Sequence, residues 1–335
     1  MVLCSLSLLF WGCSNPTELK TLAGPAQGTT WEVKFWSTEP VDTEPVVRAN
    51  LEIELERIDL ALSNFRPDST IELFNTSRST DALDVGSEIV ALVQIARLVS
   101  QASQGCYDLT IGPLWDLWGF SGDQLTPPST EEIQATLVHI GFHKIEILTP
   151  DRLRKQKADL QIDLSSIAQG YTVGRLADVL EASGIENYLA EIGGEIRTRG
   201  RKPDGSPWRI GVERPLPGGR TVQKALTITA TDPVTVLTSG TYRHYFDAEG
   251  IRYSHVLDAR SGRPIMHDTV SVTVVDENSA LADAWSTALL CLGVEEGRGA
   301  ADLAGIAALF ISERDGILTD TPTDAWSAMT GVSVQ

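Results

Sequence analysis

Basic residues are scarce in this sequence. Its 335 residues include 27 Lys and Arg against 45 Asp and Glu, which gives a formal net charge of −18 at pH 7 and a sequence pI of about 4.6. Electrostatic binding of nucleic acid needs a basic face that neutralises phosphates, and this composition can hardly supply one. We therefore expect no nucleic-acid partner, and we expect any phosphate handled by this chain to require a cation.

The common phosphate-binding motifs are missing as well. The sequence has no G-x-x-x-x-G-K-[ST], and no G-x-G-x-x-G opens a helix after a strand. Neither a P-loop nor a Rossmann site is therefore indicated. The motif G-x-S-x-G is also absent. Any chemistry must depend on less familiar arrangements of residues.

Cysteine is rare, with 4 residues in the chain. Beyond the N-terminal stretch only Cys106 and Cys291 remain, and each lies in an apolar setting. Two thiols provide neither a disulfide framework nor a cysteine metal site. They can pair only if the fold brings them together, which the sequence leaves open.

The N-terminal stretch "MVLCSLSLLFWGCSN" holds an apolar run of about a dozen residues, the length of a signal-peptide core and too short to span a bilayer. It ends at Gly12-Cys13-Ser14, and a small residue followed by Cys resembles a bacterial lipoprotein signal that is lipidated on Cys13. We assign residues 1–25 to this signal and anchor region and residues 26–335 to the folded domain. We thus expect attachment to a membrane of the bacterial cell envelope, facing the periplasm. The alternative is a buried N-terminal strand or helix.

Hydrophobic spacing predicts helices and strands that are grouped more than strictly alternating. The predicted helices cover residues 47–62, 87–105, 129–141, 167–184 and 280–293. The predicted strands cover residues 29–38, a segment ending at 163, six segments between 187 and 278, and 307–312. This grouping favours an α+β fold, with mixed or antiparallel sheets and packed helices, over a doubly wound parallel sheet.

Two polar residues interrupt the apolar helix "ALADAWSTALLCLG". Asp283 and Thr287 are four residues apart and therefore share one face. A carboxylate and a hydroxyl one turn apart can occupy adjacent positions of an octahedral Mg²⁺ site, at about 2.1 Å. From spacing alone the alternative is commoner: Thr287 bonds back to the carbonyl four residues earlier, and Asp283 caps the helix or lies at its solvent edge.

Three further stretches contain candidate functional residues. In "DLSSIAQGY" a strand ends at Asp163 before a helix begins, so backbone groups of the turn can approach a ligand, although a plain helix cap is equally compatible. The glycines of "EIGGEI" permit a tight hairpin or a close ligand, and a turn alone is the commoner explanation. His255 alternates with its neighbours along a predicted strand and is either structural or a base near neutral pH, with His244 as the rival base.

Taken together, these stretches resemble one family, the ApbE family of FAD:protein FMN transferases. The resemblance runs from Gln27 to about Gly293. Its motifs occur in family order: "GTTWEV", "LSNFRPDSTIELFN", "GCYDLTIGPLWDLWGF", "DLSSIAQGYTVGRLADVL", "EIGGEI", "SGTYRHYF", "RYSHVLDARSGRP" and "SVTVVDENSALADAWSTALLCLG". The resemblance implies an ApbE-like, T-fold-like architecture.

The resemblance also implies the residues of the site. Mg²⁺ would be held by a D-x-x-x-T helix and by a backbone oxygen of the D-L-x-x-x-x-x-G loop. The matching positions are Asp283 and Thr287, with Ser286 as a further contributor, and Ser166 or Ala168 for the loop oxygen. FAD would contact the positions that match the family's flavin-binding motifs: Gln27, Phe65, Cys106, Tyr107, Asp108, Asp163, Gln169 and Leu257. His255 matches the family's proposed base.

The implied reaction breaks the pyrophosphate of FAD and attaches FMN, through a phosphoester bond, to a Thr or Ser of a target protein, with release of AMP. If water replaces the hydroxyl, FAD is hydrolysed to FMN and AMP. A flavin-binding or flavin-hydrolysing lipoprotein without a protein acceptor is therefore one alternative, and a non-enzymatic binding module anchored by lipid is another.

Four positions depart from the family pattern. Gln27 replaces a usual Met, Phe65 a usual Tyr, and Gln169 a frequent Lys or Glu. Glu191 stands where Asn is common, and its carboxylate would repel a pyrophosphate unless it reaches a metal or a donor.

Overall fold

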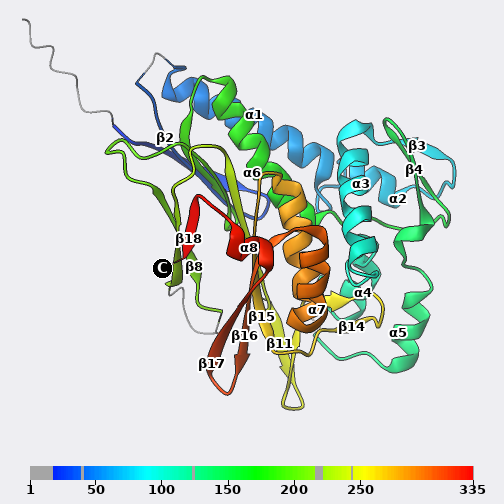
Figure 1. Ribbon diagram of the computed structural model, residues 1–335. Helices are drawn as coiled ribbons and strands as arrows, with labels where there is room; N and C mark the ends of the chain where they lie inside the picture. Colours follow the sequence, from blue (N-terminus) through cyan, green and yellow to red (C-terminus); the bar gives the residue numbers. More distant parts are fainter. Residues whose placement is uncertain (1–17, 39–40, 123–124, 216–221, 243, 335) are drawn as a thin grey trace, which may run out of the picture.

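The computed structural model describes residues 18–38, 41–122, 125–215, 222–242 and 244–334 (Figure 1). The predicted lipidation site Cys13 lies outside these residues. Within them, no helix is both long enough and apolar enough to cross a membrane.

An eight-stranded antiparallel sheet forms the centre of the fold. Its order is β1-β2-β6-β7-β10-β15-β16-β17. Its strands are β1 (Lys20–Ala26), β2 (Thr29–Trp36), β6 (Asn187–Ile192), β7 (Glu195–Arg199), β10 (Val234–Gly240), β15 (Thr269–Asp276), β16 (Ala307–Arg314) and β17 (Ile317–Pro322). Because β1 begins at Lys20, the fold includes residues that were assigned to the anchor region, and the domain boundary at residue 26 is corrected accordingly.

Smaller sheets surround this one. A three-stranded sheet contains β8 (Trp208–Glu213), β9 (Val222–Ile228) and β18 (Val332–Val334), and another contains β3 (Ala82–Asp84), β4 (Ile145–Leu148) and β5 (Arg152–Lys155). Two hairpins pair β11 (Tyr245–Ala248) with β12 (Ile251–Ser254), and β13 (Leu257–Asp258) with β14 (Arg263–Pro264).

The helices of the described residues are α1 (Glu44–Leu62), α2 (Thr70–Thr76), α3 (Gly86–Ala102), α4 (Gly112–Leu117), α5 (Thr130–Leu137), α6 (Ser165–Ala182), α7 (Ser279–Ala304) and α8 (Asp324–Ala328), with a 3₁₀ turn at Phe142–Lys144. Each predicted helix has a counterpart, and α5 begins with the reciprocal Ser129–Glu132 capping box that its sequence favours. The predicted α+β class with antiparallel sheets is confirmed.

The central sheet is covered differently on its two faces. Helices α6 and α7 pack on one face, with α1 and α3 outside them, whereas the sheet of β8, β9 and β18 covers the other (Figure 1). The alternation of a strand divides its side chains between these faces. On β16, Phe310 faces the helices and Leu309 the smaller sheet.

Helix α7 runs through the core and is interrupted once. Asn278 caps its N-terminus by accepting a hydrogen bond from the Leu281 N–H. Gly293 has a non-helical backbone with a φ of 70° and a ψ of 177°, so α7 consists of two segments joined at this residue. The break coincides with the predicted end of the helix.

Candidate active site

The crossing of α6 and α7 places a buried carboxylate against a helix backbone. Asp283 is 6 % exposed, and its Oδ2 accepts a hydrogen bond of 2.7 Å from the Gly170 N–H. A Cβ added at Gly170 would lie 2.5 Å from both the Asp283 Cβ and the Ser279 carbonyl oxygen. Only glycine at this position therefore lets the two helices approach so closely.

The charge of Asp283 is not balanced by a basic side chain of the described residues. Burial raises the pKa of Asp283 to about 7, and the hydrogen bond from Gly170 opposes that shift. A buried carboxylate without a paired cation is costly, so this position needs either a proton or a bound cation. Asp283 is also not the cap of α7, because Asn278 performs that role.

Three hydroxyl groups gather one turn further along α7. Ser239, at the end of β10, has its Oγ 2.8 Å from the Ser286 Oγ and 3.3 Å from the Thr287 Oγ1. Ser286 donates to the Asp283 carbonyl at 2.9 Å. The hydroxyl that bonds back to a carbonyl of α7 is therefore that of Ser286, and not that of Thr287 as the alternative interpretation of the sequence expected. Thr287 instead contacts Ser239 of β10.

The start of α6 brings further oxygen atoms to this crossing. Ser166 Oγ donates to the Tyr107 hydroxyl at 3.1 Å, and the Ala168 carbonyl accepts from the Thr172 Oγ1 at 2.7 Å. Asp163, just before the helix, accepts from the Ser165 N–H at 2.7 Å, as a local turn does. Carboxylate, hydroxyl and carbonyl oxygens are the donors that suit a hard divalent cation.

Gln27 and Gln169 connect this region to the sheet. Gln27 donates through Nε2 to the Thr172 Oγ1 at 2.8 Å, and its buried Oε1 has no hydrogen-bond partner in the described structure. Gln169 packs on the hairpin of β6 and β7, where a Cβ at Gly193 would lie 2.9 Å from its Nε2. The paired glycines therefore form a tight turn that touches α6.

Glu191 sits beside that turn and reaches a donor. Its Oε1 accepts a hydrogen bond of 2.7 Å from the Gly194 N–H. A carboxylate at this position would repel a pyrophosphate unless it reached a metal or a hydrogen-bond donor, and Glu191 reaches a donor.

Tyr107 and Asp108 occupy buried positions with different partners. Burial raises the pKa of Tyr107, the hydrogen bond from Ser166 opposes this, and the nearby carboxylate of Asp283 adds to it. Asp108 accepts through Oδ1 from the N–H and hydroxyl of Thr110, and through Oδ2 from the Phe142 N–H. Its carboxylate therefore braces its own loop, and burial raises its pKa.

His255 lies in the bend between β12 and β13 and not on a strand as predicted, because the chain leaves one hairpin there and enters the next. Its Nδ1 is 2.8 Å from the carbonyl oxygen of His244. A carbonyl only accepts, so Nδ1 carries the proton of the neutral ring and Nε2 is the basic nitrogen. Trp115 meets the ring edge-on at 5.9 Å between centroids.

Phe65 lies in the turn after α1 and is 92 % exposed. Its neighbour Asn64 holds the segment that carries Asp163, donating to the Ile162 carbonyl at 2.8 Å and accepting from the Leu164 N–H at 3.0 Å. The strand predicted to end at Asp163 was wrong, because asparagine side chains rather than a neighbouring strand bond the backbone of this segment. An exposed aromatic ring thus stands beside the Asp163 loop.

The predicted residues therefore fall into linked groups. The α6–α7 crossing brings together the predicted metal ligands with Tyr107, and Gln27 and Gln169 adjoin the same part of α6. Cys106 and Leu257 meet α7 one turn beyond Thr287, through a disulfide to Cys291 and a contact of 3.7 Å between the Cys291 Sγ and the Leu257 carbonyl oxygen. Because both sulfurs are bonded to each other, the grouping of Cys106, Cys291 and Asp258 does not form a thiolate metal site.

Several residues of the site were not predicted. Ser239, Gly170, Asn64 and Asn75 all lie inside motifs that were recognised, and Asn75 also bonds both backbone groups of Ile162. Their roles depend on contacts between distant segments, so the motif alone could have drawn attention to them but not assigned them.

Comparison with known proteins identifies relatives along nearly the whole chain. The ApbE family model matches residues 27–310. The chain is 37% identical to the FAD:protein FMN transferase of Vibrio cholerae serotype O1, covering 92% of both proteins, and 32% identical to that of Escherichia coli K12, covering 93% of this chain and 92% of the relative.

Solved structures agree with these relatives. "Flavin Transferase ApbE from Vibrio cholerae" superposes with a TM-score of 0.85 at 34% identity, covering 94% of this chain and 100% of that one. The apo form of the Pseudomonas stutzeri flavinyl transferase ApbE gives 0.84 at 38% identity, covering 94% and 98%. The chain therefore belongs to the ApbE family.

Proposed function

We propose that this chain transfers the FMN part of FAD to a Thr or Ser hydroxyl of a target protein and releases AMP, with Mg²⁺ bound at the α6–α7 crossing. The observation that carries this proposal is Asp283, a buried carboxylate without a cationic partner in the described structure, set among hydroxyl and carbonyl oxygens. The relatives named above are FAD:protein FMN transferases, which supports the same reaction.

The donor set fits Mg²⁺ in charge and in hardness. Asp283 and Thr287 would supply side-chain ligands, with Ser286 beside them and a backbone or hydroxyl oxygen from Ser166 or Ala168. The bound ion would neutralise charge that develops on the pyrophosphate during in-line displacement. The sequence has no P-loop lysine that would supply this charge instead.

The chain's own groups would place the substrates and move one proton. His255, held by the His244 carbonyl with Nε2 as its basic nitrogen, would accept the proton of the incoming hydroxyl. The hydroxyl oxygen would then bond to the phosphorus of the FMN phosphate while the bond to AMP breaks. The exposed ring of Phe65 would offer a stacking surface for the flavin.

The test is incubation of the purified chain with FAD, MgCl₂ and a protein that carries a flavinylation site. We expect a covalently fluorescent target band and release of AMP, both abolished by EDTA. Release of FMN and AMP without a labelled band would instead support the hydrolytic alternative. FAD left intact under all these conditions would overturn both.

We also propose that the chain is lipid-anchored through Cys13 and faces the periplasmic side of the cell envelope. The apolar run and its small-residue–Cys end support this proposal. Replacing Cys13 by Ser should move the protein from the membrane fraction to the soluble periplasmic fraction. An unchanged distribution would contradict the anchor.

A further inference from the structure

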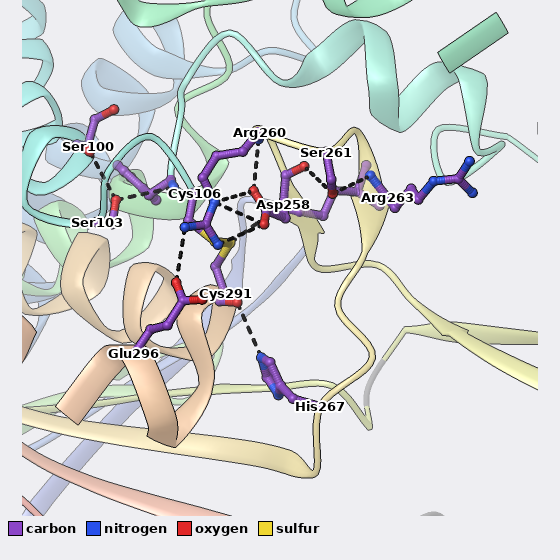
Figure 2. The surroundings of a disulfide bond; sticks show 12 residues. Ser100, Ser103, Cys106, Asp258, Arg260, Ser261, Arg263, His267, Cys291 and Glu296 are labelled. Atoms are coloured by element: carbon purple, nitrogen blue, oxygen red, sulfur yellow. Dashed lines mark hydrogen bonds and ion pairs between the residues drawn. A yellow bond between two sulfur atoms is a disulfide. The ribbon is translucent and has the colours of Figure 1, made fainter. Parts of the chain in front are cut away.

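A disulfide joins Cys106 and Cys291, which are 185 residues apart in the sequence. Both cysteines are buried, at 1 % and 4 % exposure. Arg260 lies beside the disulfide and forms salt bridges with Asp258 of β13 and Glu296 of α7 (Figure 2). These ion pairs connect the two elements next to the disulfide. The pairing that the sequence left open is therefore present in the fold.

Cys291 lies on the face of α7 that carries the proposed metal ligands. Asp283, Thr287 and Cys291 follow one another at intervals of four residues, so each lies about one turn beyond the one before it on a shared side of the helix. Four residues correspond to about 6 Å of helix length. The disulfide is thus attached one turn beyond Thr287 on the same face.

The other end of the bond belongs to the segment of Tyr107. Cys106 precedes this tyrosine, whose hydroxyl meets Ser166 of α6. The Cys106 carbonyl also accepts a hydrogen bond of 3.2 Å from the Ala259 N–H, in the segment that follows His255. Three chain segments that hold proposed site residues therefore converge at one covalent link.

The helix needs support at this place because its own hydrogen-bond ladder stops there. Gly293 breaks α7 two residues after Cys291. Side chains from the strand side bond the freed groups. His267 Nε2 lies 3.2 Å from the Cys291 carbonyl oxygen (Figure 2). Thr269 Oγ1 accepts from the Val294 N–H at 3.0 Å. A helix end held only by these contacts could slide or rotate more easily than a covalently attached one.

We propose that the Cys106–Cys291 disulfide positions the transfer site. It holds the face of α7 that bears Asp283 and Thr287 at a fixed depth and rotation against the Tyr107 and Leu257 segments. Cys291 belongs to α7 and Cys106 to the segment of Tyr107, and both are positioning residues, not catalytic ones. This inference rests on the function proposed above.

The experiment compares the double variant C106A/C291A with Leu226→Ala. Leu226 is fully buried in β9, in the core on the other face of the central sheet. Its truncation should therefore destabilise the fold without touching the disulfide or the segments that the disulfide joins. Mg²⁺ is titrated into each protein by calorimetry, FAD binding is followed by flavin fluorescence, and folding is checked by circular dichroism at the assay temperature.

We expect the double variant to bind Mg²⁺ about tenfold more weakly or worse, the usual range when a group that orients metal ligands is lost. Its Kd for FAD should rise in parallel. Leu226→Ala should lower the melting temperature but leave both constants unchanged. A double variant with a lower melting temperature and unchanged constants would show that the bond only stabilises the fold, and would overturn the inference.

A second measurement decides the question if the double variant does not fold. The wild-type protein is treated with a water-soluble phosphine, free thiols are counted by mass spectrometry, and the Mg²⁺ titration is repeated on the folded, reduced protein. Weaker binding supports the inference and unchanged binding overturns it, as would two free thiols in the untreated protein. Failure of the wild type to bind FAD or to label a target would instead count against the proposed function.

Discussion

On β10, alternate side chains point to opposite faces of the central sheet. Thr235 and Ser239 meet hydroxyl groups of α7, at 2.9 Å from Ser279 and 2.8 Å from Ser286. Val236 points the other way, into the core formed with β8 and β9. The same strand thus supplies polar groups to the helical face and apolar groups to the opposite one.

This contrast separates the sources of stability and chemistry. The core against β8 and β9 buries apolar side chains such as Trp208, Leu226 and Ile228, and such burial stabilises the fold in proportion to its area. The helical face has a large apolar core too, but it also buries Asp283 and Ser286, with the half-buried Ser239 beside them. Buried polar groups contribute little net stability, so we infer that these are retained for binding.

The strongest test of the contrast is Asp283→Ala. Loss of a fixed electrostatic group should lower the rate of FMN transfer by about 10²- to 10³-fold. The free energy of unfolding in EDTA should change little or rise, because the removed carboxylate is buried without a cationic partner in the described residues. Transfer assays and urea unfolding measure the two quantities.

Leu226→Ala should give the reverse result. Truncating a fully buried leucine costs about 2–5 kcal/mol of unfolding free energy, and transfer by the folded protein should be unaffected. If Asp283→Ala were equally destabilising and retained its response to Mg²⁺, the proposed difference between the two faces would be untenable.

The pH dependence of stability provides the second test. Burial raises the pKa of Asp283 from 3.8 to about 7, so the folded protein binds a proton that the unfolded chain has already released. In metal-free buffer its contribution to the free energy of unfolding should therefore fall between about pH 4 and pH 7, by a few kcal/mol, and level off above that range.

Unfolding of the wild type and of Asp283→Asn across this range isolates the contribution. The difference between the two should vanish near pH 4 and widen toward pH 7, and saturating Mg²⁺ should reduce the decline of the wild type. A difference that does not vary with pH would contradict the assignment of this titration to Asp283.

The approach of α6 to α7 is tested by a pair of glycines one turn apart. Gly170→Ala places a Cβ 2.5 Å from the Asp283 Cβ, whereas Gly174→Ala meets only the Ser279 side chain, at 3.3 Å from its Oγ. We expect Gly170→Ala to cost about 1–3 kcal/mol and to weaken Mg²⁺ binding. Gly174→Ala should be nearly neutral, because its better helix propensity, about 1 kcal/mol, offsets the mild crowding. Equal effects in thermal melts and metal titrations would mean that the close contact at Gly170 has no special importance.

These tests also show what local sequence could and could not predict. The spacing of Asp283 and Thr287 places them on one helix face whatever the surrounding fold, and the helices and most strands follow from periodicity in the same way. The strand predicted to end at Asp163 does not form, because distant asparagine side chains bond the backbone there. The strand position of His255 was wrong because the chain changes hairpins at that residue, a tertiary event without a local signal. Distant segments must pack together to form two other contacts of the site. Ser239 and Ser286 are 47 residues apart in the sequence, and Cys106 and Cys291 are 185 residues apart.

The smallest expected effect concerns Phe65, an apolar side chain on the helical side that is 92 % exposed and so buries almost nothing in the free protein. Stacking on a flavin is worth about 0.5–1.5 kcal/mol, so Phe65→Ala should raise the Kd for FAD by about 2- to 10-fold and leave the melting temperature unchanged. Leu303, at the far end of α7, is equally exposed, and Leu303→Ala should change neither quantity. Fluorescence titration with FAD distinguishes the two variants. Weaker FAD binding by Phe65→Ala alone would show that the exposed ring of Phe65 belongs to the binding site, whereas identical titrations would show that Phe65 is an ordinary surface residue.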